Sequence, residues 1–514
     1  MTSGERTTSR LSAFGVEGLD HILGGGLAPN RLYLLEGAPG SGKTTLALQF
    51  LLEGARQGER GLYVTLSETA EELASVVASH DWPPLDERSG VALFDLSSAE
   101  EALRPEHELT LLHPWEVELG ETIRLITEQV EKSGAARVVF DSLSEMRLLS
   151  QNPLRFRRQV LALKQYFAGR KITLLLLDDL TSAGGTQDLQ LHSLAHGVIS
   201  LHGTSVDYGA DRRRVRVVKM RAAPFRAGWH DYEIRRGGLV VFPRLVASEH
   251  DARAPELRLP SGNAELDDLL EGGPLRGSSM VITGAPGTGK TTLALQYVCA
   301  AAARGERTVI YEFEERLATM VARARSVGMD LESHMRSGRL TLRQIDPAEL
   351  SPGEFTQLVR DEVDVADPAS IVMIDSLNGY LLAMPEEKQL LLQMHELLAY
   401  LNQKGVTAVI LHPQQNLFGP MQTAVNVSYL ADVVLMLRYF EAGGRVRKAL
   451  SAVKNRGGAH EDTIREFRID DKGVSIGEAL TDFHGVLTGT PTYVGTPAPL
   501  LEDREGAEGP ARRA

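Results

Sequence analysis

Gly37-Ala-Pro-Gly-Ser-Gly-Lys-Thr44 and Gly284-Ala-Pro-Gly-Thr-Gly-Lys-Thr291 are two copies of one glycine-rich loop, and the second begins 247 positions after the first (284 − 37). Each copy continues into the same Thr-Leu-Ala-Leu-Gln sequence. Glycines let the backbone curl so that successive N–H groups converge on an anion, and a following helix adds its positive N-terminal end. A chance glycine-rich turn is the alternative, but recurrence in matching surroundings argues against it. The pair therefore predicts a duplicated module that binds a nucleoside triphosphate.

The residues of the two loops have distinct expected roles. Lys43 and Lys290 should reach the β- and γ-phosphates, and Thr44 and Thr291 should ligate Mg²⁺. Each loop lies between an apolar run, expected to be a short buried strand, and apolar residues at helical spacing. The other predicted binding residues complete the cradle and the first helical turn: Gly40, Ser41, Gly42, Thr45, Gly287, Thr288, Gly289 and Thr292.

Length and charge limit the possible classes of protein. A chain of 514 residues with an internal repeat favours two domains of roughly 240 residues over three or four. Its formal net charge of −13 argues against general nucleic-acid binding, which depends mostly on phosphate neutralisation. The first ten residues are polar, and no segment is long enough to span a bilayer. The expectation is a cytoplasmic protein that binds neither nucleic acid nor membrane.

Composition also predicts the domain organisation. We expect a flexible N-terminus at 1–10, a first domain at 11–244, a polar linker at 245–258, a second domain at 259–484, and a loop with a disordered tail at 485–514. Continuously apolar runs recur in both modules and are typical of parallel strands covered by helices on both faces. Late in each module the pattern alternates, which indicates antiparallel edge strands. The predicted fold class is therefore α/β, with two tandem P-loop domains that each contain a mostly parallel sheet flanked by helices.

One aspartate is expected at the phosphate edge of each sheet. Asp141 and Asp375 each close an apolar run and are followed by Ser-Leu. A parallel strand would deliver such a carboxylate beside the bound phosphates, where it could orient Mg²⁺. A strand-end or helix-capping aspartate is the structural alternative.

The acids after the preceding strand differ between the modules. The second module has Glu314-Glu315, whereas the first has Ser67-Glu68 at the matching positions (314 − 247 = 67). A carboxylate here could activate the attacking water, and serine is not a base of comparable strength. A solvated pair of acids is the competing interpretation. The sequence thus predicts two chemically unequal sites, with Glu68, Glu314 and Glu315 as catalytic candidates.

A pair of cations also recurs late in each module. Lys219-Met-Arg221 is matched by Lys454-Asn-Arg456, and cations at alternate positions project from one face of a strand. A solvated basic edge that prevents aggregation is one explanation. Recurrence in both modules favours the other, in which the pair acts as an arginine finger on the nucleotide of a neighbouring subunit.

In combination these motifs resemble the KaiC family, circadian-clock ATPases and autokinases of the RecA superfamily, over about Leu11 to Tyr493. The resemblance implies RecA-like folds, bound ATP with Mg²⁺, and a homo-hexamer of two stacked rings with ATP at the subunit interfaces. The cations that would then act in trans are Lys219, Arg221, Lys454, Arg456 and His460. Phe225 stands where the first module would carry the histidine equivalent to His460.

The chain departs from this family where phosphorylation is expected. The family modifies a Ser-Thr pair in its second domain, but here Ser428 is followed by Tyr429. A two-site Ser/Thr cycle is therefore not expected, and Ser428 is the single candidate phosphosite of a serine/threonine autokinase. Ser67 departs likewise from the first-ring ATPase of the family. The stretch 487–493 is similar to the loop before the family's regulatory tail, which makes the C-terminal tail a candidate site for protein signalling partners.

Three functions follow from these motifs. The first is a KaiC-like ATPase with a signalling or timing role. The second is a DNA-dependent ATPase of recombination or repair, which would need a basic DNA-binding loop; residues 178–185 begin with two acids, and 412–420 contain no Lys or Arg. The third is a nucleotide-gated signalling scaffold, which the sequence does not separate from the first.

Overall fold

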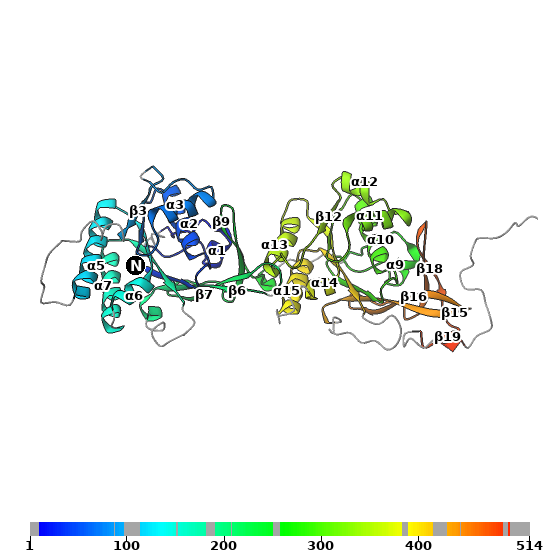
Figure 1. Ribbon diagram of the computed structural model, residues 1–514. Helices are drawn as coiled ribbons and strands as arrows, with labels where there is room; N and C mark the ends of the chain where they lie inside the picture. The colour runs from blue at the N-terminus through cyan, green and yellow to red at the C-terminus, as the bar shows by residue number, and fades with distance from the viewer. Residues whose placement is uncertain are drawn as a thin grey trace, which may run out of the picture. The chain divides into compact units, whose positions relative to one another are not determined.

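The computed structural model of the chain describes residues 10–86, 88–96, 114–150, 153–180, 191–206, 208–249, 257–382, 389–414, 429–442, 444–486 and 492–493. The chain divides into two compact units, Met1–Arg244 and Leu245–Ala514 (Figure 1). Both units have the same layered architecture, as the duplicated loop predicts. No helix in the described ranges combines the length and the apolar character needed to cross a membrane.

The first unit begins with the short helix α1 and the strand that leads into the glycine-rich loop. Its helices are α1 (Glu17–Ile22), α2 (Lys43–Arg56), α3 (Ala70–Ser79), α5 (Pro114–Ser133), α6 (Leu143–Ser150) and α7 (Pro153–Gly169). Its strands are β1 (Leu32–Gly37), β2 (Gly61–Thr65), β3 (Val91–Asp95), β4 (Arg137–Asp141), β5 (Thr173–Asp179), β6 (Gly197–Thr204), β7 (Arg212–Met220), β8 (His230–Arg235) and β9 (Gly238–Phe242).

These strands form one sheet in the order β3-β2-β4-β5-β1-β6-β7-β8-β9. Pairing is parallel from β3 to β6 and antiparallel from β6 to β9. Helices α1 to α3 cover one face of the sheet and α5 to α7 the other, with a separate apolar core on each side (Figure 1). The carboxyl ends of the parallel strands therefore meet at one edge, where the glycine-rich loop follows β1.

The second unit repeats this order of elements. It opens with the 3₁₀ turn η1 (Ala247–Glu249) and has helices α9 (Ala264–Asp268), α10 (Lys290–Ala303), α11 (Leu317–Ser326), α12 (Leu331–Arg336), α13 (Pro352–Val363), α14 (Leu377–Leu382) and α15 (Leu390–Gln403). Its strands are β10 (Ser279–Gly284), β11 (Arg307–Glu312), β12 (Leu340–Gln344), β13 (Ala369–Asp375), β14 (Thr407–Pro413), β15 (Val433–Ala442), β16 (Arg445–Asn455), β17 (Arg465–Asp470), β18 (Gly473–Ala479), β19 (Phe483–His484) and β20 (Thr492–Tyr493).

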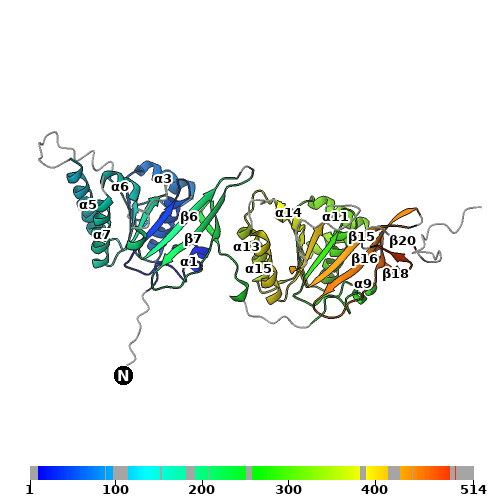
Figure 2. The ribbon, with the colours of Figure 1, turned by 90° about the horizontal axis from the view of Figure 1, so that it is seen from below.

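Its main sheet has the order β12-β11-β13-β14-β10-β15-β16-β17-β18, which is strand for strand the order of the first unit. Helices α9 to α12 pack on one face and α13 to α15 on the other (Figure 1); Figure 2 shows α13 and α15 side by side in a second view. Strands β19 and β20 form a separate antiparallel pair. The predicted fold class, two tandem domains with mostly parallel sheets and antiparallel edge strands, is confirmed.

The outer strands β3 and β12 are the parallel strands that periodicity did not reveal. In each of them most residues are only half-buried, whereas every residue of the neighbouring β2 is buried. In β12, the sequence Leu340-Thr-Leu-Arg-Gln344 mixes polar and apolar side chains, so it lacks the continuous apolar run that marks its neighbours. In β3 a short apolar run, Val91-Ala-Leu-Phe94, is present, and the strand differs from its neighbours in burial.

Candidate functional site

The two glycine-rich loops have the same backbone conformation. Gly42 and Gly289 immediately precede α2 and α10 and have positive φ angles of 87° and 106°. A Cβ at Gly289 would lie 2.4 Å from the Ile469 Cδ1 atom and 3.0 Å from the Phe467 Cε1 atom of β17, so a larger residue would have to displace these side chains as well as adopt an unfavourable backbone angle. Each loop therefore presents its N–H groups at the start of a 14-residue helix.

The two loop lysines have different partners. The Lys43 Nζ atom donates hydrogen bonds to the carbonyls of Gly37 and Ala38, both at 3.0 Å, and forms an ion pair with Asp179 at 2.7 Å. Lys290 Nζ donates to the Ala285 carbonyl at 3.0 Å. The strand register places a proline of β14 opposite the second loop at the position of Asp179. Only the first lysine thus has a carboxylate from the central strand beside it among the described residues.

The hydroxyl residues of the loops lie at or near the start of the helix that follows each loop. Thr291 Oγ1 donates to Asp375 Oδ2 at 2.9 Å, which brings two hard oxygen ligands together. The Thr44 side chain lies within hydrogen-bonding reach of the carboxyls of Asp141 and Glu68. The remaining loop hydroxyls are buried at the start of their helices: Ser41, Thr45, Thr288 and Thr292.

Asp141 is the last residue of β4, and Asp375 is the last residue of β13. These strands lie directly beside β2 and β11, which precede the Ser67-Glu68 and Glu314-Glu315 pairs. Asp141 is buried and accepts a hydrogen bond from the Tyr63 hydroxyl, and burial raises its pKa. Burial raises the pKa of Asp375 to about 6, against the lowering effect of the Thr291 hydrogen bond. Both carboxyls stand beside the loop threonine, at the edge where phosphates would bind.

The acids after β2 and β11 occupy matching places. The register pairs Thr65 with Asp141 in the first unit and Glu312 with Asp375 in the second, so Ser67 corresponds to Glu314. Ser67 is exposed. Glu314 Oε1 accepts a hydrogen bond from the Ser376 hydroxyl, next to the strand-end aspartate.

The second member of each pair has a different environment. Glu315 forms an ion pair with Arg323 of α11 at 2.8 Å. Glu68 is half-buried, and burial together with the charge of Asp141 raises its pKa to about 6. It is followed by Thr69, whose side chain and that of Glu72 form a capping box at the start of α3. The structure thus brings Glu68 to Asp141 and Glu314 to Asp375, while Glu315 is held by α11.

Sequence reasoning missed Glu312, the last residue of β11. This side chain is 1% exposed, and burial with the nearby Asp375 raises its pKa to about 7. The signal in the sequence that could have identified it is a single acid inside an otherwise apolar run, Thr308-Val-Ile-Tyr-Glu-Phe313. Such an acid is costly to bury unless it is hydrogen-bonded, which makes it worth attention.

The recurrent cations lie at the amino ends of the parallel strands, whereas the loop of their own unit lies at the carboxyl ends. The Arg221 amide donates to the His196 carbonyl, and the His196 amide donates to the Leu32 carbonyl at the start of β1. Lys219 is level with Val198, near the start of β6. Because the loop follows the far end of β1, about 16 Å of strand separates it from these cations.

The second unit has the same arrangement. The Arg456 amide donates to the Asp432 carbonyl, and the Asp432 amide donates to the Ser279 carbonyl at the start of β10. Lys454 Nζ donates to the Ala431 carbonyl at 2.7 Å. In both units the cations therefore lie at the end of the sheet remote from their own glycine-rich loop.

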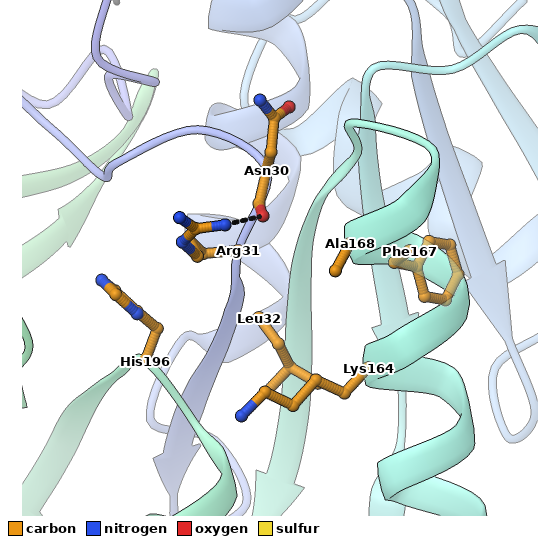
Figure 3. Close-up of a pocket in the computed structure, with 7 residues that line it drawn as sticks. All are labelled: Asn30, Arg31, Leu32, Lys164, Phe167, Ala168 and His196. Carbon is orange, nitrogen blue, oxygen red and sulfur yellow. Dashed lines mark hydrogen bonds between the residues drawn. The ribbon is translucent and has the colours of Figure 1, made fainter.

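A basic cavity lies beside the cations of the first unit. It has a volume of about 220 Å³ and is bordered by the start of β1, the end of α7 and the residue before β6 (Figure 3). Arg31, Lys164 and His196 contribute its charged or titratable groups. Burial and the charges of Arg31 and Arg221 lower the pKa values of Lys164 and His196. Basic side chains therefore cluster at this end of the first sheet.

The remaining predicted residues are placed as follows. His460 is half-buried in the segment after β16, and Phe225 packs against the core of the first unit. Tyr429 is exposed. Ser428 lies outside the described residues, as do most of the C-terminal tail and residues 1–9 of the N-terminus.

Comparison with known proteins gives a consistent result over both units. The KaiC ATPase family matches residues 13–246 and again residues 259–481. The chain is 28% identical to the circadian clock protein KaiC3 of Synechocystis sp. over 490 residues, which cover 93% of this chain and 94% of that protein. It is also 28% identical to the circadian clock oscillator protein KaiC of Synechococcus elongatus over 487 residues, which cover 93% and 91% of the two chains. The chain is a member of the KaiC family of ATPases.

Proposed function

We propose that the second site hydrolyses ATP and that the first site binds ATP mainly to hold the assembly together. The observation that carries this division is that Ser67 and Glu314 occupy equivalent positions in the two units but differ in chemistry. Glu314 stands beside Asp375-Ser376, where a carboxylate can accept a proton from water. Ser67 has no comparable basicity, which leaves Glu68 as the acid of the first pair.

The described residues fit ATP with Mg²⁺ at the second site. Thr291 and Asp375 supply adjacent oxygen donors that would hold the ion, and Mg²⁺ typically takes one or two protein ligands together with substrate phosphates. The ion would neutralise charge on the phosphates during transfer. Lys290 would bind the β- and γ-phosphates, Glu314 would accept the proton of the attacking water, and Glu315 would support its orientation.

The first site has the corresponding binding residues but lacks a carboxylate at the position of Glu314. Lys43 would bind the phosphates, and Thr44 with Asp141 would hold Mg²⁺. The Lys43–Asp179 ion pair must open for Lys43 to reach a γ-phosphate, because the ammonium group is engaged by that carboxylate. Slow exchange and slow turnover of nucleotide are the properties expected of a site that supports assembly.

Single-site variants test the division of labour. Lys290→Ala should remove most ATP turnover, and Lys43→Ala should retain most of it in chains that still assemble. Phosphate release measures the turnover, and native mass spectrometry measures the oligomer. If Lys290→Ala kept most of the activity while remaining hexameric, the assignment of hydrolysis to the second site would be wrong.

We also infer that the recurrent cations act on the nucleotide of a neighbouring subunit in a homo-hexameric double ring. In both units they lie across the sheet from their own loop, a separation of about 16 Å that a Lys or Arg side chain cannot span. A neighbour packed against this edge would bring its own nucleotide to them. In the second unit the proposed groups are Lys454, Arg456 and His460; in the first they are Lys219 and Arg221.

Co-assembly of two inactive variants tests the action in trans. Lys290→Ala lacks a working second loop, and Arg456→Ala lacks the donated cation. Co-expressed chains with two different tags would form interfaces in which an intact loop meets an intact Arg456, and these interfaces should recover activity. Doubly tagged Lys290→Ala chains provide the matched control. Absence of recovery in mixed hexamers would show that Arg456 acts within its own chain or not at all.

We also propose a timing or signalling role, which is supported by the similarity to relatives named as circadian clock proteins. If the second domain is also an autokinase, the γ-phosphoryl group of ATP would pass to the Ser428 hydroxyl, with release of ADP and a proton. Intact-mass and peptide mass spectrometry after incubation with MgATP would detect one added phosphate at Ser428. A protein that remains unmodified under hydrolysing conditions would exclude this activity.

A further inference from the structure

Glu312 connects the strand end of the second site to its acidic pair. It is the last residue of β11 and lies level with Asp375 of β13. Its Oε1 atom accepts the amide N–H of Glu314 at 3.0 Å and the amide N–H of Glu315 at 2.8 Å. One carboxyl oxygen therefore fixes the backbone of both acids at once.

In the first unit a neutral residue forms the corresponding hydrogen bond to the backbone of the turn. Thr65 has the matching register position beside Asp141. Its hydroxyl accepts the amide N–H of Glu68 at 2.9 Å and donates to the Glu68 carbonyl at 2.8 Å. The turn after the strand can thus be closed by a hydroxyl, without burial of a carboxyl group.

Closing the same turn with Glu312 carries a free-energy cost, because a carboxyl group is buried. It is nearly fully buried, and its Oε2 atom has no hydrogen-bond partner among the described residues. It also lies in a strongly acidic environment beside Asp375 and the acidic pair. A buried polar group of this kind destabilises a protein unless it is compensated elsewhere. Its double contact with the acidic pair is the feature that the first unit lacks.

We propose that Glu312 is a positioning residue of the second site, which holds the backbone of Glu314 and Glu315 so that the two side chains diverge correctly. Glu314 then reaches Ser376 and the phosphate edge, while Glu315 reaches Arg323 of α11. The inference rests on the proposed role of Glu314 in hydrolysis. Glu312 itself contacts the backbone of the pair, so it acts through these two residues.

Three variants in the full-length chain test this role. Glu312→Leu removes the acceptor at similar volume, Glu312→Gln keeps one acceptor oxygen for the two amides, and Glu312→Thr introduces the residue of the first unit. Glu312→Leu should lower kcat by on the order of 10²-fold, because misplacement of a catalytic group by about 1 Å has an effect of that size. Glu312→Gln should restore kcat to within about threefold of the unmodified chain, with Glu312→Thr between them.

The readouts separate positioning from a purely structural role. KM and the affinity for a fluorescent ATP analogue should change less than about twofold in Glu312→Gln and Glu312→Leu, since the loop itself is untouched. Thr65→Val, the matched change in the first unit, should leave second-site turnover unchanged. Full activity of Glu312→Leu would overturn the proposal. So would equally low activity of Glu312→Leu and Glu312→Gln, or a loss of kcat that accompanies loss of nucleotide affinity.

Failure of this inference can be distinguished from failure of the proposed function. Glu314→Gln tests the function itself and should abolish most turnover. If Glu314→Gln were inactive while Glu312→Leu and Glu312→Thr were fully active, only the positioning role would be lost. If Glu314→Gln were fully active, the base would have been assigned wrongly and the positioning argument would fall with it.

Discussion

Introducing a base into the first site should create a second hydrolytic centre. Ser67→Glu places a carboxylate at the register position of Glu314. Ser67 is exposed, so the new charge carries little desolvation cost. Ser142 follows Asp141 as Ser376 follows Asp375, and Ser376 is the hydroxyl that donates to Glu314. The first site therefore already contains a donor that could orient the new carboxylate.

The expected gain is about 10²-fold in first-site turnover. A positioned general base contributes about 10² to 10⁴-fold. We expect the lower limit, because Thr65 fixes the Glu68 amide whereas Glu312 fixes the amides of both acids in the second unit. A 10²-fold gain corresponds to about 2.7 kcal/mol of barrier lowering.

Phosphate release in the Lys290→Ala background isolates this effect, since the second loop is disabled there. Ser67→Gln is the matched control, because it has the same length but cannot act as a base. The reciprocal change, Glu314→Ser in the Lys43→Ala background, should lower second-site turnover by a similar factor. If Ser67→Glu were no faster than Ser67→Gln in assembled, nucleotide-bound chains, Glu314 would not be the group that distinguishes the sites.

Three further predictions concern backbone, pH and stability. Gly289→Ala should destabilise the second unit by about 3 kcal/mol in thermal unfolding and weaken ATP binding. Gly305 also has a positive φ but has open space where a Cβ would lie, so Gly305→Ala should destabilise the same unit by about 1 kcal/mol. Equal effects of the two changes would contradict the steric argument. Burial raises the pKa of Glu312 to about 7 in the folded protein, against an ordinary 4.5, so the folded state is favoured at low pH and its free energy of unfolding falls as pH rises from 4.5 toward 7. Denaturant unfolding should show this fall relative to Glu312→Gln, and parallel curves for the two proteins would refute the shift. Arg137 is fully buried, forms an ion pair with Glu59 at 2.5 Å and donates to the Phe50 carbonyl at 2.9 Å, so Arg137→Ala should destabilise the first unit by about 3 kcal/mol in calorimetry, and an unchanged first transition would contradict this.

Much of the fold could be predicted because its signals are local. The glycine pattern before Lys43 and Lys290 requires only a few consecutive residues, and it specifies both the backbone turn and the helix that follows. Central parallel strands such as β4 and β13 are buried on both faces, so they appear as continuous apolar runs that end in Asp141 and Asp375. The half-buried strand β12 carries no such run, and the short run Val91-Ala-Leu-Phe94 of β3 was not recognised as a strand.

Sequence alone was enough to identify two glycine-rich loops, to assign each to a parallel sheet, and to find Ser67 and Glu314 at matching positions of the two modules. Three contacts became visible only in the folded chain: Lys43 meets Asp179, Glu312 accepts the amides of the acidic pair, and the recurrent cations lie at the end of the sheet remote from their own loop. The physical reason is the range of the interactions. Backbone conformation and strand burial are encoded over a few neighbouring residues, whereas these contacts depend on strand order and register, which bring together segments far apart in the chain.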